Sequence, residues 1–188
     1  MRIVGILLAA GAGTRFGGAK LMARLDDGTS IGARSCATLV AALGEVIAVV
    51  RPGEAALADA LAAAGARVTV CEQSTHGMGA SIAHGIAMAE PCDAIIVALG
   101  DMPWVSTTTI AKLAAALEGG AALVVPRYQS RRGNPVGLGR IHFAALRALT
   151  GDRGARDLID HATVVSWIDV DDPAIVRDVD TVDDLHRR

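Results

Sequence analysis

Apolar residues in this chain form short continuous runs, and longer segments with helical spacing separate them. Continuous rather than alternating apolar runs are typical of strands covered on both faces, as in a parallel sheet. The predicted strands span residues 3–9, 45–50, 66–70, 93–99 and 122–126. The predicted helices span residues 31–43, 54–64, 79–89 and 106–117, the last with Ser106 as its N-cap. This alternation predicts an α/β fold, Rossmann-like, with a mostly parallel sheet and helices on both faces.

The pattern changes after residue 128. Residues 131–135 form a polar turn that is compatible with the opening of a hairpin. Helical spacing returns over residues 141–149 and 155–161, and a further strand is predicted over residues 163–170, followed by an Asp-rich tail. Because no linker, repeat or low-complexity segment divides the chain, residues 1–188 are predicted to form a single domain.

Composition and charge exclude several classes of protein. The formal net charge of −2 disfavours a nucleic-acid binder, and no apolar run approaches the ~18 residues of a membrane span. The three cysteines are widely spaced and show no metal-binding pattern, which is typical of buried thiols in a reducing compartment. We therefore expect a cytoplasmic protein that binds neither nucleic acid nor a membrane.

A glycine-rich segment follows the first predicted strand. Residues 8–20 have the sequence LAAGAGTRFGGAK. Glycines allow backbone N–H groups to approach an anion, and Arg15 and Lys20 add positive charge on the same loop. These features favour a binding site for a polyphosphate at the carboxyl edge of the sheet.

Three interpretations of this loop compete. A Rossmann dinucleotide loop requires an acidic residue at the end of the second strand, where this chain has Arg51 and Pro52. A Walker loop requires Ser or Thr directly after the lysine, where this chain has Leu21. A plain strand–helix turn explains neither the number of glycines nor the two cations.

The loop resembles the nucleotidyltransferase signature, and more narrowly that of the molybdenum cofactor cytidylyltransferase family and its guanylyltransferase relatives. The resemblance implies a fold like that of the nucleotide-diphospho-sugar transferases and a nucleotide-binding loop. It also implies that His76-Gly77-Met78-Gly79-Ala80-Ser81 forms a second turn near the nucleotide. The nucleotide-binding residues implied in this way are Leu8, Ala9, Ala10, Gly11, Gly13, Arg15, Lys20, Gly77 and Ser81.

Two acidic motifs extend the resemblance. Asp101, in the segment GDMP of residues 100–103, follows a predicted strand at the ligand-binding edge, where a carboxylate can hold Mg²⁺ against phosphates. The segment DVDTVDDL of residues 178–185 resembles the family's ending, although Val182 replaces the usual Pro. The family resemblance implies that Asp101 and Asp180 are Mg²⁺ ligands, and that Arg15, Lys20 and Asp101 are catalytic.

The other late aspartates are interpreted as solvated surface, and Asp184 also as a capping partner of Thr181. These surface residues are Asp169, Asp171, Asp172, Asp183 and Asp184.

Residues 132–137, RGNPVG, resemble the family segment beside the acceptor. The resemblance implies that Gly133, Asn134 and Pro135 contact the pterin side of the acceptor, although Asn134 replaces the commoner His. A simple Asn-Pro turn remains the alternative.

The resemblance predicts an enzyme that transfers CMP from CTP to the phosphate of molybdopterin cofactor, with Mg²⁺, and releases pyrophosphate. CTP is favoured over GTP because Ala10 stands where GTP-using members tend to have Gly. A molybdoenzyme or its chaperone is a possible partner. The alternatives are a guanylyltransferase, a sugar-phosphate nucleotidyltransferase, which usually has Pro where this chain has Ala19, and a non-catalytic chaperone that delivers the cofactor.

Overall fold

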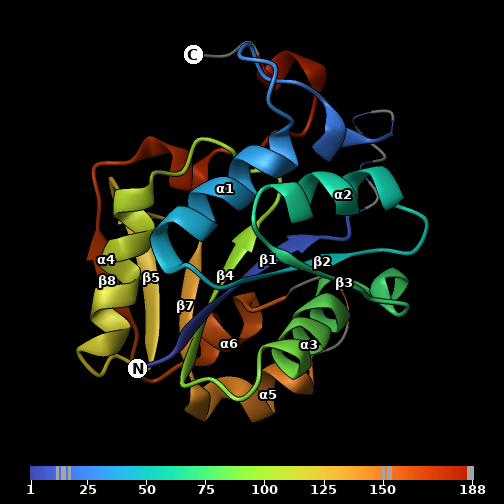
Figure 1. Ribbon diagram of the computed structural model, residues 1–188. Helices are drawn as coiled ribbons and strands as arrows, with labels where there is room; N and C mark the ends of the chain where they lie inside the picture. The colour runs from blue at the N-terminus through green and yellow to red at the C-terminus, as the bar shows by residue number, and fades with distance from the viewer. Residues whose placement is uncertain (12, 14–15, 17, 150, 152–153, 186–188) are drawn as a thin grey trace.

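A computed structural model of the chain describes residues 1–11, 13, 16, 18–149, 151 and 154–185. Across these residues one eight-stranded sheet has the order β3-β2-β1-β4-β7-β5-β6, and β8 pairs with β5 (Figure 1). The strands are β1 (Ile3–Ala9), β2 (Val46–Val50), β3 (Arg67–Val70), β4 (Ala94–Leu99), β5 (Leu123–Tyr128), β6 (Arg131–Arg132), β7 (Val136–Gly139) and β8 (Ser166–Asp169). The predicted α/β class with a mostly parallel sheet is confirmed.

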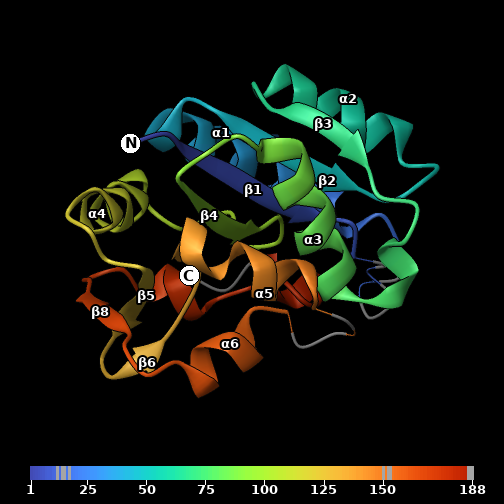
Figure 2. The same cartoon turned by 90° about the horizontal axis from the view of Figure 1, so that it is seen from below.

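Helices cover both faces of the sheet: α1, α2 and α4 pack against one face, and α3, α5 and α6 pack against the other (Figure 2). The α-helices are α1 (Ile31–Leu43), α2 (Ala55–Ala63), α3 (Met78–Ala89), α4 (Thr107–Glu118), α5 (Phe143–Arg147) and α6 (Arg156–His161). Short 3₁₀ helices are η2 (Lys20–Met22), η3 (Ser74–His76), η4 (Arg140–His142), η5 (Pro173–Val176) and η6 (Val182–Leu185). None of the described helices is long and apolar enough to cross a membrane.

Two apolar cores lie on the opposite faces of the sheet. Side chains of α1, α2 and α4 form one core, and side chains of α3 and α5 form the other. The α3 helix approaches β1 so closely that a Cβ at Gly85 would lie 2.7 Å from the Ile6 Cγ2, so only glycine fits there. All three cysteines are buried and free, as expected, and burial raises the pKa of the Cys36 thiol to about 11.

The helix caps follow from the sequence. The Ser30 hydroxyl oxygen accepts a hydrogen bond from the Ala33 N–H at the start of α1. The Ser106 hydroxyl oxygen accepts one from the Thr109 N–H at 3.1 Å, which confirms the predicted N-cap of α4.

The second half of the chain differs from the prediction. The strand β7 was not predicted, yet it lies antiparallel between β4 and β5. Its sequence, VGLG, carries a glycine at every second position, and glycine is depleted in strands. Gly137 packs closely against α4, since a Cβ at this position would lie 3.0 Å from the Leu117 Cδ1.

Other predicted elements of this half are shorter than expected. The predicted helix over residues 141–149 is the short pair η4 and α5, and the predicted strand over residues 163–170 is the four-residue β8. A hairpin does form, between β5 and β6, but its turn is at Gln129 and Ser130, which have positive φ. The first two residues of the predicted turn over 131–135 instead form the strand β6.

The direction of β7 determines what reaches the ligand-binding edge of the sheet. Because β7 is antiparallel to β4, with Val136 opposite Val97, its first residue lies near the carboxyl end of β4. The segment that precedes β7, with Gly133 and Asn134, therefore lies at the same edge as the glycine loop after β1.

Candidate active site

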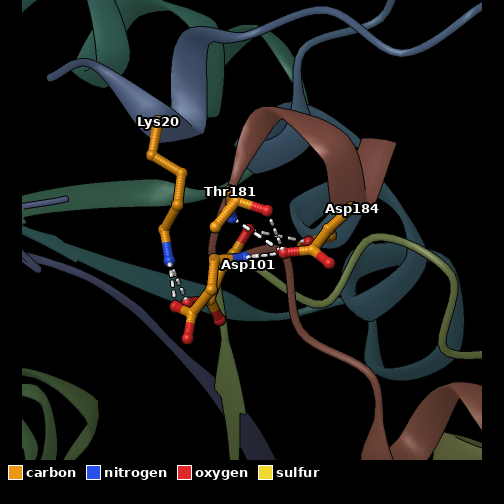
Figure 3. A network of polar contacts seen from close by, with 7 residues as sticks. Lys20, Asp101, Thr181 and Asp184 are labelled. Atoms are coloured by element: carbon orange, nitrogen blue, oxygen red, sulfur yellow. Dashed lines mark hydrogen bonds and ion pairs between the residues drawn. The ribbon is translucent and has the colours of Figure 1, made fainter. Parts of the chain in front are cut away.

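A lysine and three carboxylates meet at the carboxyl edge of the sheet. Figure 3 shows the Lys20 ammonium beside the Asp101 carboxylate. Asp101 follows β4, and Lys20 begins η2. The Lys20 Nζ lies 2.7 Å from the Asp101 Oδ2 and 3.6 Å from the Asp180 Oδ1. Asp101, Asp178 and Asp180 each offer an oxygen within 4.8 Å of the other two. The side chains of this cluster are partly exposed to solvent: Lys20 is 14% exposed, Asp101 23% and Asp180 32%.

The backbone before Asp101 is fixed from three sides. The Gly100 N–H donates to the Leu8 carbonyl at 2.9 Å, and the Gly100 carbonyl accepts from the Ser35 hydroxyl at 2.9 Å. A Cβ at Gly100 would lie 3.0 Å from the Leu8 carbonyl oxygen and 3.1 Å from the Leu21 Cδ1. Because Gly100 has no Cβ, the end of β4 can pack closely against β1. This close packing fixes the position of the Asp101 carboxylate.

The C-terminal tail is bonded directly to the same segment. The Val179 N–H donates to the Asp101 carbonyl at 2.9 Å, and the Val179 side chain is completely buried. Asp178 and Asp180 flank this anchored residue, so the burial of Val179 holds both carboxylates beside Asp101.

Asp184 orders the next turn of the tail. Its Oδ2 accepts hydrogen bonds from the Asp180 N–H at 3.1 Å, the Thr181 N–H at 2.8 Å and the Thr181 hydroxyl at 2.8 Å (Figure 3). The interpretation of Asp184 as solvated surface is therefore wrong, whereas its pairing with Thr181 is observed. The carboxylate is used because the backbone N–H groups of a tight turn need an acceptor.

An aromatic contact holds the tail from the other end. The Arg177 guanidinium carbon lies 3.9 Å from the centroid of the Trp104 ring, and an Arg177 N–H donates to the Asp184 carbonyl at 3.3 Å. Trp104 follows Asp101 by three residues and Arg177 precedes Asp178 directly. This cation–π pair therefore joins the two segments that carry the carboxylates.

The donor set fits a hard divalent cation. All three groups are carboxylates, and oxygen-only ligand sets suit Mg²⁺ or Mn²⁺ rather than a softer metal. The Lys20 ammonium already stands among these oxygens as a positive charge. Asp178 was missed in the sequence, although its spacing of two residues from Asp180 was visible there.

Five of the predicted nucleotide-binding residues line a cavity of about 400 Å³, here called the loop cavity, at the carboxyl end of β1. The predicted residues in its wall are Leu8, Ala10, Gly11, Gly77, Ser81 and Asp101. A smaller cavity of about 80 Å³ adjoins it and is lined in part by Ala9, Gly13 and Lys20. Arg15 lies outside the described residues. The structure thus brings the described members of the predicted set together, and their roles stay predictions.

A second cavity of about 370 Å³, here called the apolar cavity, lies on the α3 and α6 face of the sheet. It shares Leu8, Met78 and Leu99 with the loop cavity, so the two are neighbours. Gly133 and Asn134 line it, as expected of acceptor-side residues, but Pro135 does not. Pro135 lies in the wall of a separate cavity of about 20 Å³.

Gly133 is required where the tail crosses this segment. A Cβ at Gly133 would lie 2.3 Å from the Ile175 carbonyl oxygen, which also accepts a hydrogen bond from the Asn134 N–H at 2.9 Å. No other residue fits this close approach.

The interpretation of Asp172 as solvated surface is wrong. Asp172 is buried, with 9% of its surface exposed. Its Oδ2 accepts hydrogen bonds from the Ser106 N–H at 2.9 Å and the Thr109 hydroxyl at 2.7 Å, and its Oδ1 accepts one from the Ala174 N–H at 3.1 Å. A carboxylate is favoured here because the start of α4 has unsatisfied N–H groups and a positive dipole end.

Asp169, in contrast, is exposed as expected and pairs with Arg127, whose hydrogen bonds lower the pKa of the Asp169 carboxyl. Asp171 and Asp183 are exposed as well.

Comparison with known proteins identifies the family. The model of the MobA-like NTP transferase domain matches residues 5–166. The chain belongs to this family. As a MobA-like chain it is a nucleotidyltransferase, which confirms the predicted family type and enzyme class.

Similar proteins match this chain over nearly its whole length. Nicotine blue oxidoreductase of Paenarthrobacter nicotinovorans is 32% identical over 195 residues, which cover 98% of this chain and 95% of that protein. The crystal structure of Rv0371c from Mycobacterium tuberculosis H37Rv has 30% identity and a TM-score of 0.86, with 100% of this chain and 96% of that chain covered. A manganese complex of Rv0371C from the same organism has 27% identity and a TM-score of 0.84, with coverages of 100% and 97%.

Proposed function

We propose that this MobA-like nucleotidyltransferase transfers CMP from CTP to the phosphate of a molybdopterin-type cofactor. The observation that carries the proposal is the cluster of Lys20 and three carboxylates beside the loop cavity, whose wall includes Asp101. Lys20 lines the smaller cavity that adjoins it, and the apolar cavity is its other neighbour. A triphosphate in the loop cavity and an acceptor in the apolar cavity would meet near Leu8 and Leu99. A transfer reaction needs such a meeting point for its two substrates.

In the proposed reaction a phosphate oxygen of the acceptor attacks the α-phosphorus of CTP. A new P–O bond forms, the bond from the α-phosphorus to the bridging oxygen breaks, and pyrophosphate leaves. Lys20 would stabilise negative charge on the triphosphate and on the departing pyrophosphate, together with Arg15 and the N–H groups of Gly11 and Gly13. No general base is needed, because the second pKa of a phosphate monoester is about 6.

Asp101, Asp178 and Asp180 would hold the divalent cation, with Mg²⁺ as the proposed ion. When bound, the cation supplies positive charge that neutralises the phosphates of both substrates. The oxygen-only donor set supports this assignment, and a manganese complex exists for a relative with 27% identity.

The preference for CTP rests on the wall of the loop cavity. Ala10 lines this cavity with Gly77 and Ser81, and its methyl group reduces the room for a purine. We expect Ala10→Gly to increase the rate with GTP relative to the rate with CTP. An unchanged ratio would remove Ala10 from the explanation.

The name of one relative makes oxidoreductase activity a second candidate. Arg51 lies just after β2, where dinucleotide-binding sheets hold the ribose, and an arginine there suits the 2′-phosphate of NADP. In this chain the Arg51 Nε donates to the Glu54 Oε1 at 2.7 Å, which occupies part of its five N–H donors and does not decide between the two functions. The three carboxylates beside the loop are explained by a metal–triphosphate site and not by a dinucleotide site.

A pyrophosphate-release screen tests the proposal. CTP, GTP, ATP and UTP are each incubated with molybdopterin cofactor or with simple sugar phosphates, with and without Mg²⁺, and NADPH oxidation is followed in parallel. The expected result is Mg²⁺-dependent release from CTP with molybdopterin cofactor. Release only with GTP indicates a guanylyltransferase, release only with sugar phosphates indicates another acceptor, and CTP binding without any release indicates a delivery chaperone. NADPH oxidation without pyrophosphate release would replace transfer by redox chemistry.

A further inference from the structure

The apolar cavity carries positive charge in its wall. Aliphatic side chains form most of its wall, among them Leu8, Ile82, Leu99 and Ile159. Arg132 and Arg156 are the charged residues among the described residues that line it. An uncharged ligand could accept hydrogen bonds from the two guanidinium groups, whereas an anionic ligand would also gain charge attraction and hydrogen bonds about twice as strong.

The two arginines come from different elements and are held differently. Arg132 belongs to β6, and its Nη1 donates to the Asp160 carboxylate on α6. This ion pair orients the guanidinium and occupies only part of its five N–H donors. Arg156 begins α6 and is exposed, and its guanidinium forms no ion pair or hydrogen bond with the side chains that the structure describes.

We infer that Arg132 and Arg156 bind an anionic group of the acceptor and so select acceptors whose flat or apolar body carries negative charge. The inference rests on the proposed function, because it gives the acceptor side of that reaction its specificity residues. Arginine suits this task because its planar fork of donors binds phosphate or carboxylate in a bidentate manner. The anionic group is either the attacking phosphate or a second acidic group of the acceptor, and the test separates them.

The test uses Arg156→Ala, Arg132→Ala and the double variant, with Arg131→Ala as the control. Arg131 lies on the same strand and is exposed, but it does not line the cavity. Arg132→Lys keeps the charge and the link to Asp160, in case Arg132→Ala disturbs the fold. The KM for molybdopterin cofactor, the KM for CTP and kcat are measured by pyrophosphate release, and cofactor binding without CTP is measured by pterin fluorescence.

The expected result is a rise of about tenfold to a hundredfold in the KM and Kd for the cofactor in Arg156→Ala, since hydrogen bonds to charged groups are the stronger ones. The KM for CTP and the Arg131→Ala control stay unchanged. Repeating the binding with dephosphorylated cofactor separates the two sources. If the variant then binds like the wild type, the arginine holds the phosphate, and if the defect persists, it holds another acidic group.

Unchanged cofactor Kd values in Arg156→Ala and in the double variant would overturn the inference. That result differs from a failure of the proposed function, in which the wild-type protein itself releases no pyrophosphate from CTP and cofactor. An equal rise in the KM for CTP would also overturn the inference, because the arginines would then affect both cavities and not the acceptor alone.

Discussion

The two neighbouring cavities of this protein are built in opposite ways. At the edge of the loop cavity, Lys20 and the carboxylates of Asp101, Asp178 and Asp180 come from three distant segments of the chain. Directional bonds hold them, such as the hydrogen bond from Val179 to the Asp101 carbonyl. In the apolar cavity, aliphatic side chains of the sheet and of α3 and α6 provide the shape.

The difference indicates what each cavity contributes. Charges held in fixed positions stabilise the charge that develops in a transition state, so changes at the cluster should affect turnover first. Aliphatic walls contribute shape and desolvation, so changes there should affect recognition of the acceptor first. This contrast can be tested from the cluster outwards.

The largest effect is expected for Asp101→Asn, which keeps the shape of the side chain and removes its charge. We expect turnover to fall about a thousandfold, because metal ions supply several kcal/mol of charge stabilisation and each ~1.4 kcal/mol is a factor of ten. Pyrophosphate release and Mn²⁺ binding by calorimetry measure the loss. Asp183→Asn, which changes an exposed carboxylate of the same tail, is the control. Normal turnover in Asp101→Asn would show that the cluster is not the metal site.

The second effect concerns Lys20→Met, for which turnover and metal affinity should move in opposite directions. Turnover should fall about tenfold to a hundredfold, since a charged hydrogen bond to the triphosphate is lost. Mn²⁺ should bind more tightly in the absence of nucleotide, because the ammonium 2.7 Å from Asp101 no longer competes for that carboxylate.

The other lysine of the chain provides the control for this variant. Lys112 is exposed on α4, and Lys112→Met should change neither quantity. Weaker Mn²⁺ binding in Lys20→Met would show that Lys20 does not compete with the metal for Asp101. Lys20 would then stabilise the metal site instead.

A smaller effect is expected for Trp104→Leu, which removes the ring beneath Arg177. We expect the Mg²⁺ concentration for half-maximal activity to rise about threefold to tenfold, since a cation–π contact contributes about 0.5–2 kcal/mol. The KM for CTP should stay unchanged, which separates a positioning role from a general loss of structure. Trp104→Phe keeps a ring and should restore most of the affinity, and Trp167→Phe, on the partly exposed Trp167 of β8, is the control. If Trp104→Leu and the wild type need the same Mg²⁺ concentration for half-maximal activity, the contact between Trp104 and Arg177 does not position the metal ligands.

Much of the fold could be predicted from the sequence where apolar runs are continuous. The strand β1 and the helix α1 have the predicted bounds, residues 3–9 and 31–43, because burial on one or both faces leaves a clear pattern. The strand β7 could not be predicted, because its glycines, Gly137 beside Leu117 and Gly139 beside Ala122, give no strand signal.

The sequence predicts most residues of the site, but it predicts few of the contacts between them. Lys20, Asp101 and Asp180 were chosen from motifs, and the structure brings them together. The contribution of Asp178 and the contact between Trp104 and Arg177 depend on how the tail returns to β4, which has no local signature. The same long-range return buries Asp172, which a local pattern had assigned to the surface.

Asp172→Asn should have the smallest effect on turnover, although it changes a buried carboxylate. Asn offers one acceptor oxygen in place of two, so it leaves either the start of α4 or the Ala174 N–H without a partner. Unfolding free energy should fall by about 1–3 kcal/mol, the cost of an unsatisfied buried polar group, as measured by urea denaturation. Asp171→Asn, at the exposed neighbouring position, should leave stability unchanged. Because Asp172 touches neither cavity wall, kcat at low temperature should match the wild type, and a large loss of kcat in a folded variant would show that the α4 cap is coupled to the charged cluster.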